Sequence, residues 1–133
     1  MTKGSVAAMG AKSQRKGRAA ELELSRILQG YSYPVEAGCA QSYGEVPDLS
    51  GLPQIHIECK RCEKLHLSEW MRQASDDAEK FGDGMPAVFF RRNREVWMVC
   101  IELKGWLQLY QKAQGCKCGG RCHEAVENSE KGE

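Results

Sequence analysis

Residues 54–60, near the middle of the chain, alternate between polar and apolar side chains. A period of two is typical of a β-strand, because successive side chains of a strand point to opposite faces of the sheet. The row expected to face the core consists of Ile55, Ile57 and Cys59. His56, Glu58 and Lys60 would point to the other surface, with the carboxylate and the ammonium group about 6–7 Å apart at roughly 3.3 Å of rise per residue. This stretch therefore predicts a strand with one face in the core of a sheet.

The rest of the sequence contains further helix and strand patterns, separated by glycine, proline and charged turns. Apolar residues recur every three or four positions in three segments, which predicts helices at 14–29, 66–81 and 104–114. Shorter runs of apolar and β-branched residues predict strands at 31–37, 85–90 and 95–103, with a short extended segment starting at Asp48. Gly82 is expected to end the second helix. The order αβββαββ, followed by a last helix, predicts a mixed α/β fold in which helices flank a central β-sheet.

Length and composition narrow the class of protein. A chain of 133 residues with 41% hydrophobic and 28% charged residues fits one folded domain. No apolar run approaches the roughly 20 residues of a membrane span, and the N-terminus lacks the apolar segment of a secretory signal. We therefore expect a cytoplasmic location, with the seven cysteines as free thiols or metal ligands. A net charge of +1 does not by itself favour nucleic-acid binding, so such binding must rest on local charge.

Acidic and basic side chains meet in two short motifs that are separated by nine residues. The motifs are Val46-Pro47-Asp48 and Glu58-Cys59-Lys60. If the segment starting at Asp48 pairs with the next strand, its carboxylate arrives beside Glu58. Two carboxylates next to a lysine suit a hard cation such as Mg²⁺ or Mn²⁺. Such a cation can lower the pKa of a bound water, and Lys60 can orient this water or stabilise a pentacovalent phosphate. The pattern predicts hydrolysis of a nucleic-acid backbone.

In these motifs the sequence resembles the PD-(D/E)XK nuclease superfamily, in which an acidic residue, often preceded by proline, is followed by Glu/Asp-x-Lys on the next strand. Within this superfamily it is most similar to the Holliday junction resolvases of the archaeal and phage type. Their first helix has a basic, glycine-containing start followed by a glutamate. The corresponding residues here are Arg15-Lys16-Gly17-Arg18-Ala19-Ala20-Glu21.

The resemblance covers residues 14–103 and implies a metal-dependent endodeoxyribonuclease with a restriction-endonuclease-like core. It implies that Glu21 completes the metal site with Asp48 and Glu58, and that Lys60 is catalytic. It also implies that the basic side chains at the start of the helix contact DNA phosphates, namely Arg15, Lys16 and Arg18. The chain would then consist of a flexible basic arm (1–13), a nuclease domain (14–114) and a cysteine-rich, then acidic tail (115–133).

Resolution of a symmetric junction requires two active sites, so a chain with one nuclease domain is expected to act as a homodimer. The candidate pairing surface on the last helix comprises Trp106, Leu107, Leu109 and Tyr110. The small size and the single nuclease domain suit a phage or prophage gene.

Three other features have both a structural and a functional interpretation. His56 points toward the expected site, and we interpret it as a solvated or hydrogen-bonded strand residue. Gln73, early in the second helix, is a further candidate site residue, because related nucleases sometimes place a glutamine there. The tail holds the potential Zn²⁺ ligands Cys116, Cys118, Cys122 and His123. The alternative is that this tail is disordered and reduced.

Two other functions remain compatible with the sequence. The first is a nicking or restriction-repair nuclease that acts on ordinary duplex DNA with the same metal site. The second is a non-catalytic DNA-binding adaptor with a zinc-binding tail. Every acidic and basic position of the motif is present, which favours an active enzyme.

Overall fold

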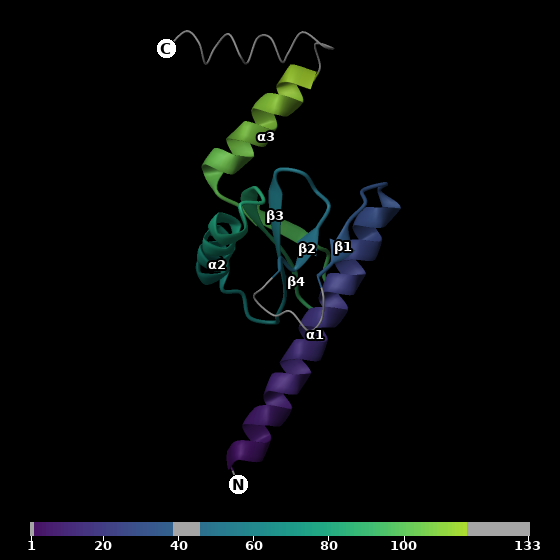
Figure 1. Cartoon of the computed structure of the whole chain (residues 1–133), viewed down its shortest axis with the longest axis vertical. Coiled ribbons are helices and arrows are strands. Elements are labelled where there is room, and N and C mark those ends of the chain that lie inside the picture. The colour runs from purple at the N-terminus through teal and green to yellow at the C-terminus, as the bar shows by residue number, and fades with distance from the viewer. Residues whose placement is uncertain (1, 39–45, 117–133) are drawn as a thin grey trace. The chain divides into compact units, whose positions relative to one another are not determined.

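The structure of the chain, a computed structural model, describes residues 2–38 and 46–116 (Figure 1). Side chains are described within 16–38 and 46–115. The chain divides into two units, Met1–Ile101 and Glu102–Glu133. The first unit contains the sheet and two helices, and the described part of the second contains one helix.

The first unit is built on a single five-stranded sheet with the order β1-β2-β3-β4-β5. The strands are β1 (Glu36–Ala37), β2 (Leu49–Ser50), β3 (Ile55–Arg61), β4 (Met85–Arg91) and β5 (Met98–Ile101). β3 and β4 are parallel, and the other neighbouring strands are antiparallel. A parallel pair requires a crossover connection, which α2 (Leu67–Phe81) supplies. The predicted α/β class, a mixed central sheet flanked by helices, is confirmed.

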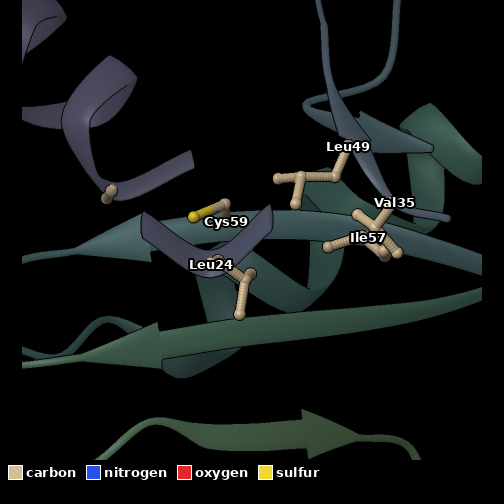
Figure 2. Close-up of a cluster of buried hydrophobic side chains, with 6 residues drawn as sticks. Leu24, Val35, Leu49, Ile57 and Cys59 are labelled. Carbon is tan, nitrogen blue, oxygen red and sulfur yellow. The ribbon is translucent and has the colours of Figure 1, made fainter. Parts of the chain in front are cut away.

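One helix packs on each face of the sheet (Figure 1). α1 (Thr2–Gly30) covers the face of β3 that carries Ile57 and Cys59, the predicted core row. The core on this face consists of Ala20, Leu24, Val35, Leu49, Ile57 and Cys59 (Figure 2). The core under α2 consists of Trp70, Ala74, Val88 and Phe90. Because the sheet is covered on both sides, the polar row of β3 is enclosed as well.

Burial of this polar row differs from the surface position that the alternation predicts. The side chains of His56 and Glu58 are only 1% and 4% exposed. The reason is topological, because the crossover helix between parallel strands covers the face opposite α1. Alternation within β3 identifies which residues share a face, but it contains no information about what covers that face.

α1 begins at Thr2, twelve residues before its predicted start at residue 14. The added segment includes the strong helix formers Ala7, Ala8 and Ala11, which offset the glycines at 4 and 10. The division of the chain into arm, nuclease domain and tail stays a prediction.

Two predicted strands are shorter in the structure. The run 31–37 pairs only at Glu36–Ala37, because Ser32 has a φ of 72° and Pro34 has no backbone N–H to donate. The run 95–103 pairs only at Met98–Ile101, because Arg94 adopts a φ of 59° and the residues after it complete a turn.

The C-terminal end of α2 is as predicted. Gly82 adopts a left-handed conformation with a φ of 60°, and its N–H donates to the carbonyl oxygen of Ala78 at 2.8 Å. Gly84 follows with a φ of 137°, and a Cβ atom there would lie 2.2 Å from the carbonyl carbon of Gln54. Asp83 is therefore held between two glycines, close to the beginning of β3.

α3 (Leu103–Cys116) forms the described part of the second unit, close to the predicted range of 104–114. Its large exposed side chains include the four residues of the candidate pairing surface, Trp106, Leu107, Leu109 and Tyr110. The rings of Trp106 and Tyr110 stack with their centroids 5.1 Å apart. Within the described parts of the chain, no helix combines the length and apolar character needed to cross a membrane.

Candidate active site

A pocket of about 560 Å³ opens in the first unit, between α1, β3 and α2. Its lining includes Glu21 from α1, Asp48, which directly precedes β2, and Glu58 from β3. The antiparallel register pairs Leu49 with Ile57, and one further step of the same register places Asp48 opposite Glu58. The sheet therefore brings two carboxylates to one place, and the packing of α1 adds a third.

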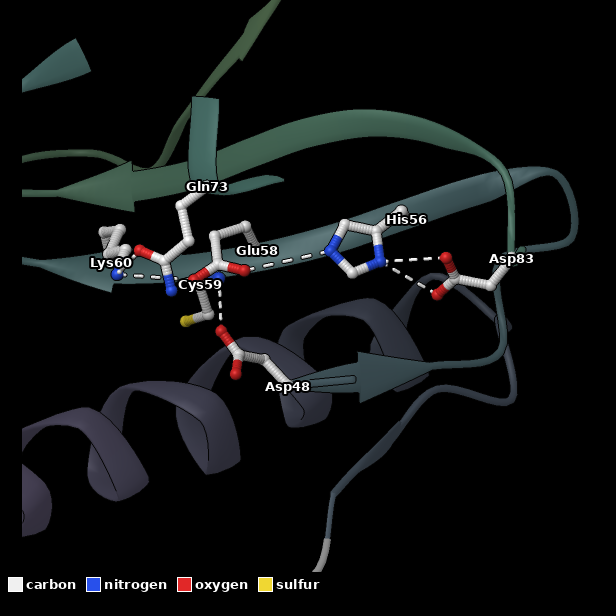
Figure 3. A network of polar contacts seen from close by, with 7 residues as sticks. All are labelled: Asp48, His56, Glu58, Cys59, Lys60, Gln73 and Asp83. Atoms are coloured by element: carbon white, nitrogen blue, oxygen red, sulfur yellow. Dashed lines mark hydrogen bonds and ion pairs between the residues drawn. The ribbon is translucent and has the colours of Figure 1, made fainter. Parts of the chain in front are cut away.

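Asp48 is held by the backbone of the neighbouring strand (Figure 3). Its Oδ2 accepts a hydrogen bond of 3.0 Å from the N–H of Cys59. Burial and the nearby charge of Glu58 raise the pKa of Asp48 from 3.8 to about 7. The hydrogen bond from Cys59 and the charge of Lys60 act in the opposite direction but do not cancel these effects. Asp48 therefore experiences more negative than positive charge from its surroundings.

The pKa of Glu21 is raised as well, mainly because this side chain is partly buried. The charge of Glu58 contributes to the increase. Arg18, whose Nη1 lies 3.5 Å from Glu21 Oε2, lowers the pKa without reversing the shift. Because Glu58 acts electrostatically on both Glu21 and Asp48, the three carboxylates form one interacting group.

Lys60 lies beside this group and is positioned by two contacts. Its Nζ lies 3.3 Å from Glu58 Oε1 and donates a hydrogen bond of 2.9 Å to Oε1 of Gln73 (Figure 3). Gln73 is on α2, so the helix that covers this face of the sheet also fixes the direction of the ammonium group. The structure thus gives the candidate Gln73 a physical partner within the pocket.

The basic residues of the α1 motif have different surroundings. Lys16 lines the pocket. Arg18 donates from Nη1 to the carbonyl oxygen of Gly38, so part of its hydrogen-bonding capacity is used within the protein. The side chain of Arg15 lies outside the described residues. Arg61 also lines the pocket, although the sequence motifs did not indicate it.

Two pocket residues, His56 and Asp77, were not selected as site residues from the sequence. One ligand atom each from His56, Glu58 and Asp77 lies within 4.8 Å of the other two. A signal for His56 existed, because it shares the predicted strand face with Glu58. A weaker signal existed for Asp77, because it follows Gln73 by four residues and therefore lies one helical turn further along the same face.

The acidic group has the composition expected of a cation site. Oxygen ligands suit hard divalent cations, and the charges of Glu58 and Glu21 add to the effect of burial in raising the pKa of Asp48. Glu21 and Asp48 do not belong to the tight group within 4.8 Å that includes Glu58. A cation bound by all three carboxylates would therefore draw them closer or contact some of them through water.

Comparison with protein families agrees with the motifs and the fold. Residues 12–118 match the family described as "Phage putative PDDEXK endonuclease". The chain belongs to this family. It is thus a member of the PD-(D/E)XK superfamily, with a fold compatible with a restriction-endonuclease-like core. A comparison with curated proteins found no match.

Six of the seven cysteines of this PD-(D/E)XK nuclease fall into two groups, and the seventh, Cys39, lies outside the described residues. Cys59, Cys62 and Cys100 are free thiols, and burial raises the pKa of the Cys59 thiol, which keeps it protonated and unreactive. Cys116 is the last residue of α3, and its side chain is not described. Cys118, Cys122 and His123 lie outside the described residues, so the zinc site stays a prediction.

Proposed function

We propose that this nuclease is a Mg²⁺-dependent DNA endonuclease (Mn²⁺ would serve the same site) that cuts branched DNA, including Holliday junctions, as a homodimer. The observation that supports the metal-dependent reaction is the raised pKa of Asp48, about 7, in a pocket shared with Glu58 and Lys60. Carboxylates held this close without enough compensating charge provide a site for a divalent cation.

In this proposal Glu21, Asp48 and Glu58 hold the cation. A bound divalent cation supplies an activated water and neutralises charge that builds up on the phosphodiester. Lys60 directs its ammonium protons toward the attacked phosphate, where they stabilise the developing negative charge. Gln73 is a positioning residue that acts through its hydrogen bond of 2.9 Å to Lys60.

DNA would approach the pocket past its basic lining. Lys16 and Arg61 both line the pocket and would contact phosphates on either side of the cut. Arg18 would add to these contacts, although it also bonds to Gly38. Arg15 is expected to contact phosphates only from its place in the sequence motif, because its side chain is not described. Phosphate contacts of this kind position DNA without reading its sequence, so we expect a weak dependence on base sequence.

The preference for branched DNA is supported by the resemblance of the α1 motif to the resolvases. The homodimer is supported by the exposed apolar side chains of α3, Trp106, Leu107, Leu109 and Tyr110. A twofold pair would present two pockets to a symmetric junction, one for each strand that must be cut.

The proposal is tested by incubating the full-length protein with Mg²⁺ and labelled DNA in three forms: a four-way junction, a flap and a linear duplex of the same sequence. We expect paired cuts in the junction, slower cutting of the duplex and no cutting in EDTA. Equal cutting of all three DNAs would instead support a nicking or restriction-repair nuclease. Binding without cleavage of any DNA would support the non-catalytic adaptor.

Two variants separate the activity of this protein from that of a contaminant. Asp48→Ala removes a proposed ligand and should abolish cleavage. Asp76→Ala is the matched control, because Asp76 is an exposed carboxylate on α2 that does not line the pocket, and it should cut like the wild type.

A further inference from the structure

His56 is buried in the sheet but uses only one of its two ring nitrogens. Its side chain is 1% exposed, and Nδ1 lies 2.9 Å from both carboxylate oxygens of Asp83 (Figure 3). A carboxylate accepts hydrogen bonds, so Nδ1 carries a proton and donates it to Asp83. Burial lowers the pKa of His56, but the nearby carboxylates of Glu58 and Asp83 outweigh this effect and raise it. Nε2, from which a bound cation would displace a proton, has no hydrogen-bond partner among the described residues. A buried polar atom without a partner is costly and indicates that something else binds there.

The atoms that face Nε2 are those of potential metal ligands. Oε2 of Glu58 lies 3.8 Å from Nε2, which is too far for a hydrogen bond. The other oxygen of Glu58, Oε1, is directed to Lys60. Asp77 approaches from α2, and the ligand atoms of the three residues lie within 4.8 Å of one another. One nitrogen and two carboxylates therefore surround a common point in the pocket.

We propose that His56, Glu58 and Asp77 bind a divalent first-row transition-metal ion, with Nε2 of His56 as the nitrogen ligand. Imidazole suits ions of the Mn²⁺ to Zn²⁺ series, whereas Mg²⁺ is bound almost entirely by oxygen. Asp83 has the role that a carboxylate commonly has behind a metal-binding histidine, because it fixes the tautomer and the orientation of the ring. The glycines on both sides of Asp83 hold it in this place.

This site is distinct from the one proposed around Asp48, because two of its three ligands are different. Glu58 would contribute to both sites, so the two cations would lie side by side in the same pocket. The site requires only the three side chains and Asp83, and it does not depend on nuclease activity.

The test uses Mn²⁺, because it is paramagnetic and prefers oxygen ligands, so it suits the two carboxylates of this site and avoids the thiols of the tail. The decrease of the free Mn²⁺ signal in electron paramagnetic resonance measures how many Mn²⁺ ions the full-length protein binds. Spin-echo modulation of the bound ion then reports whether a nitrogen is coordinated. We expect the wild type to bind one Mn²⁺ with a nitrogen ligand at this site, in addition to the Mn²⁺ that the site proposed around Asp48 would bind.

Variants assign that nitrogen. His56→Gln should remove the nitrogen signal and weaken binding at this site at least about tenfold. Asp77→Asn, a milder change at a half-buried helix position, should weaken binding by a similar factor in a fully folded protein. His66→Gln is the control, because His66 is exposed at the start of α2 and should have no effect.

Two results would overturn the proposal: Mn²⁺ binding without a nitrogen signal, and a nitrogen signal that survives His56→Gln. Asp48→Ala distinguishes it from the proposed function, because this variant should lose DNA cleavage and keep the nitrogen-coordinated Mn²⁺. A wild type that binds Mn²⁺ through His56 but cuts no DNA would support this site and refute the endonuclease.

Discussion

Replacement of Asp48 by asparagine should make the metal-free protein more stable at alkaline pH. The pKa of Asp48 is about 7 in the folded protein and has an ordinary value of 3.8. A folded-state pKa above the unfolded value means that the folded protein favours the protonated form. Stability from this group is therefore complete below the unfolded pKa and is lost as the pH rises from about 4 to about 7.

The size of the loss follows from the shift. At 1.36 kcal/mol per pKa unit, the ionised carboxylate costs the fold up to about 4 kcal/mol at about pH 8. Asparagine removes the charge but keeps an oxygen that can accept the 3.0 Å hydrogen bond from Cys59. The free energy of unfolding of Asp48→Asn should exceed that of the wild type by about 4 kcal/mol at about pH 8, and by only about 1 kcal/mol at about pH 4.5.

Urea denaturation in EDTA at both pH values measures this difference from the midpoints and slopes. Mg²⁺ should then raise the stability of the wild type at about pH 8 and have little effect on the variant, because only the wild type gains a ligand in the folded state. An equal or lower stability of Asp48→Asn at alkaline pH, or a gain that does not change with pH, would refute the electrostatic reasoning.

Three further predictions concern positioning and packing. Lys60→Ala should reduce the single-turnover cleavage rate at least about 10²-fold without weakening Mg²⁺ binding in calorimetry, because it removes a positive charge 3.3 Å from Glu58. A parallel loss of Mg²⁺ affinity would contradict a role in catalysis alone. Gln73→Leu should lower the same rate by about tenfold, because Lys60 loses its 2.9 Å hydrogen bond to residue 73. An unchanged cleavage rate would show that this hydrogen bond is dispensable. Arg91→Lys should reduce the free energy of unfolding by about 1–2 kcal/mol, because lysine cannot replace the two 2.9 Å hydrogen bonds to Glu23. DNA cleavage by the folded variant should not change.

The parts of the fold that the sequence predicts well are those that local periodicity determines. Strand β3 follows from the alternation in 54–60, and α2 follows from its apolar face and the glycine at 82. The length over which a strand pairs is harder to predict from the sequence. The apolar run 31–37 has only two paired residues, because Ser32 and Pro34 divert the backbone. α1 also begins earlier than predicted, because the helix-forming alanines at 7, 8 and 11 offset the glycines at 4 and 10.

The candidate site could likewise be predicted where its residues lie in short sequence motifs, but not where it depends on contacts between distant segments. Asp48, Glu58 and Lys60 could be identified because two short motifs on neighbouring strands contain them. The alternation placed His56 on the face of Glu58, but its role could not be inferred, because it depends on Asp83, which follows α2, and on Asp77 within that helix. Only the crossover between parallel strands brings these residues to the buried face of β3.

The most direct test of the central claim is DNA cleavage by Asp48→Asn in the presence of Mg²⁺ under single-turnover conditions at alkaline pH. If the carboxylate at this position holds a divalent cation, the variant will be folded, more resistant to urea than the wild type when both are in EDTA, and unable to cut DNA in Mg²⁺. Cleavage at the rate of the wild type would show that the acidic pocket is not where the phosphodiester is hydrolysed.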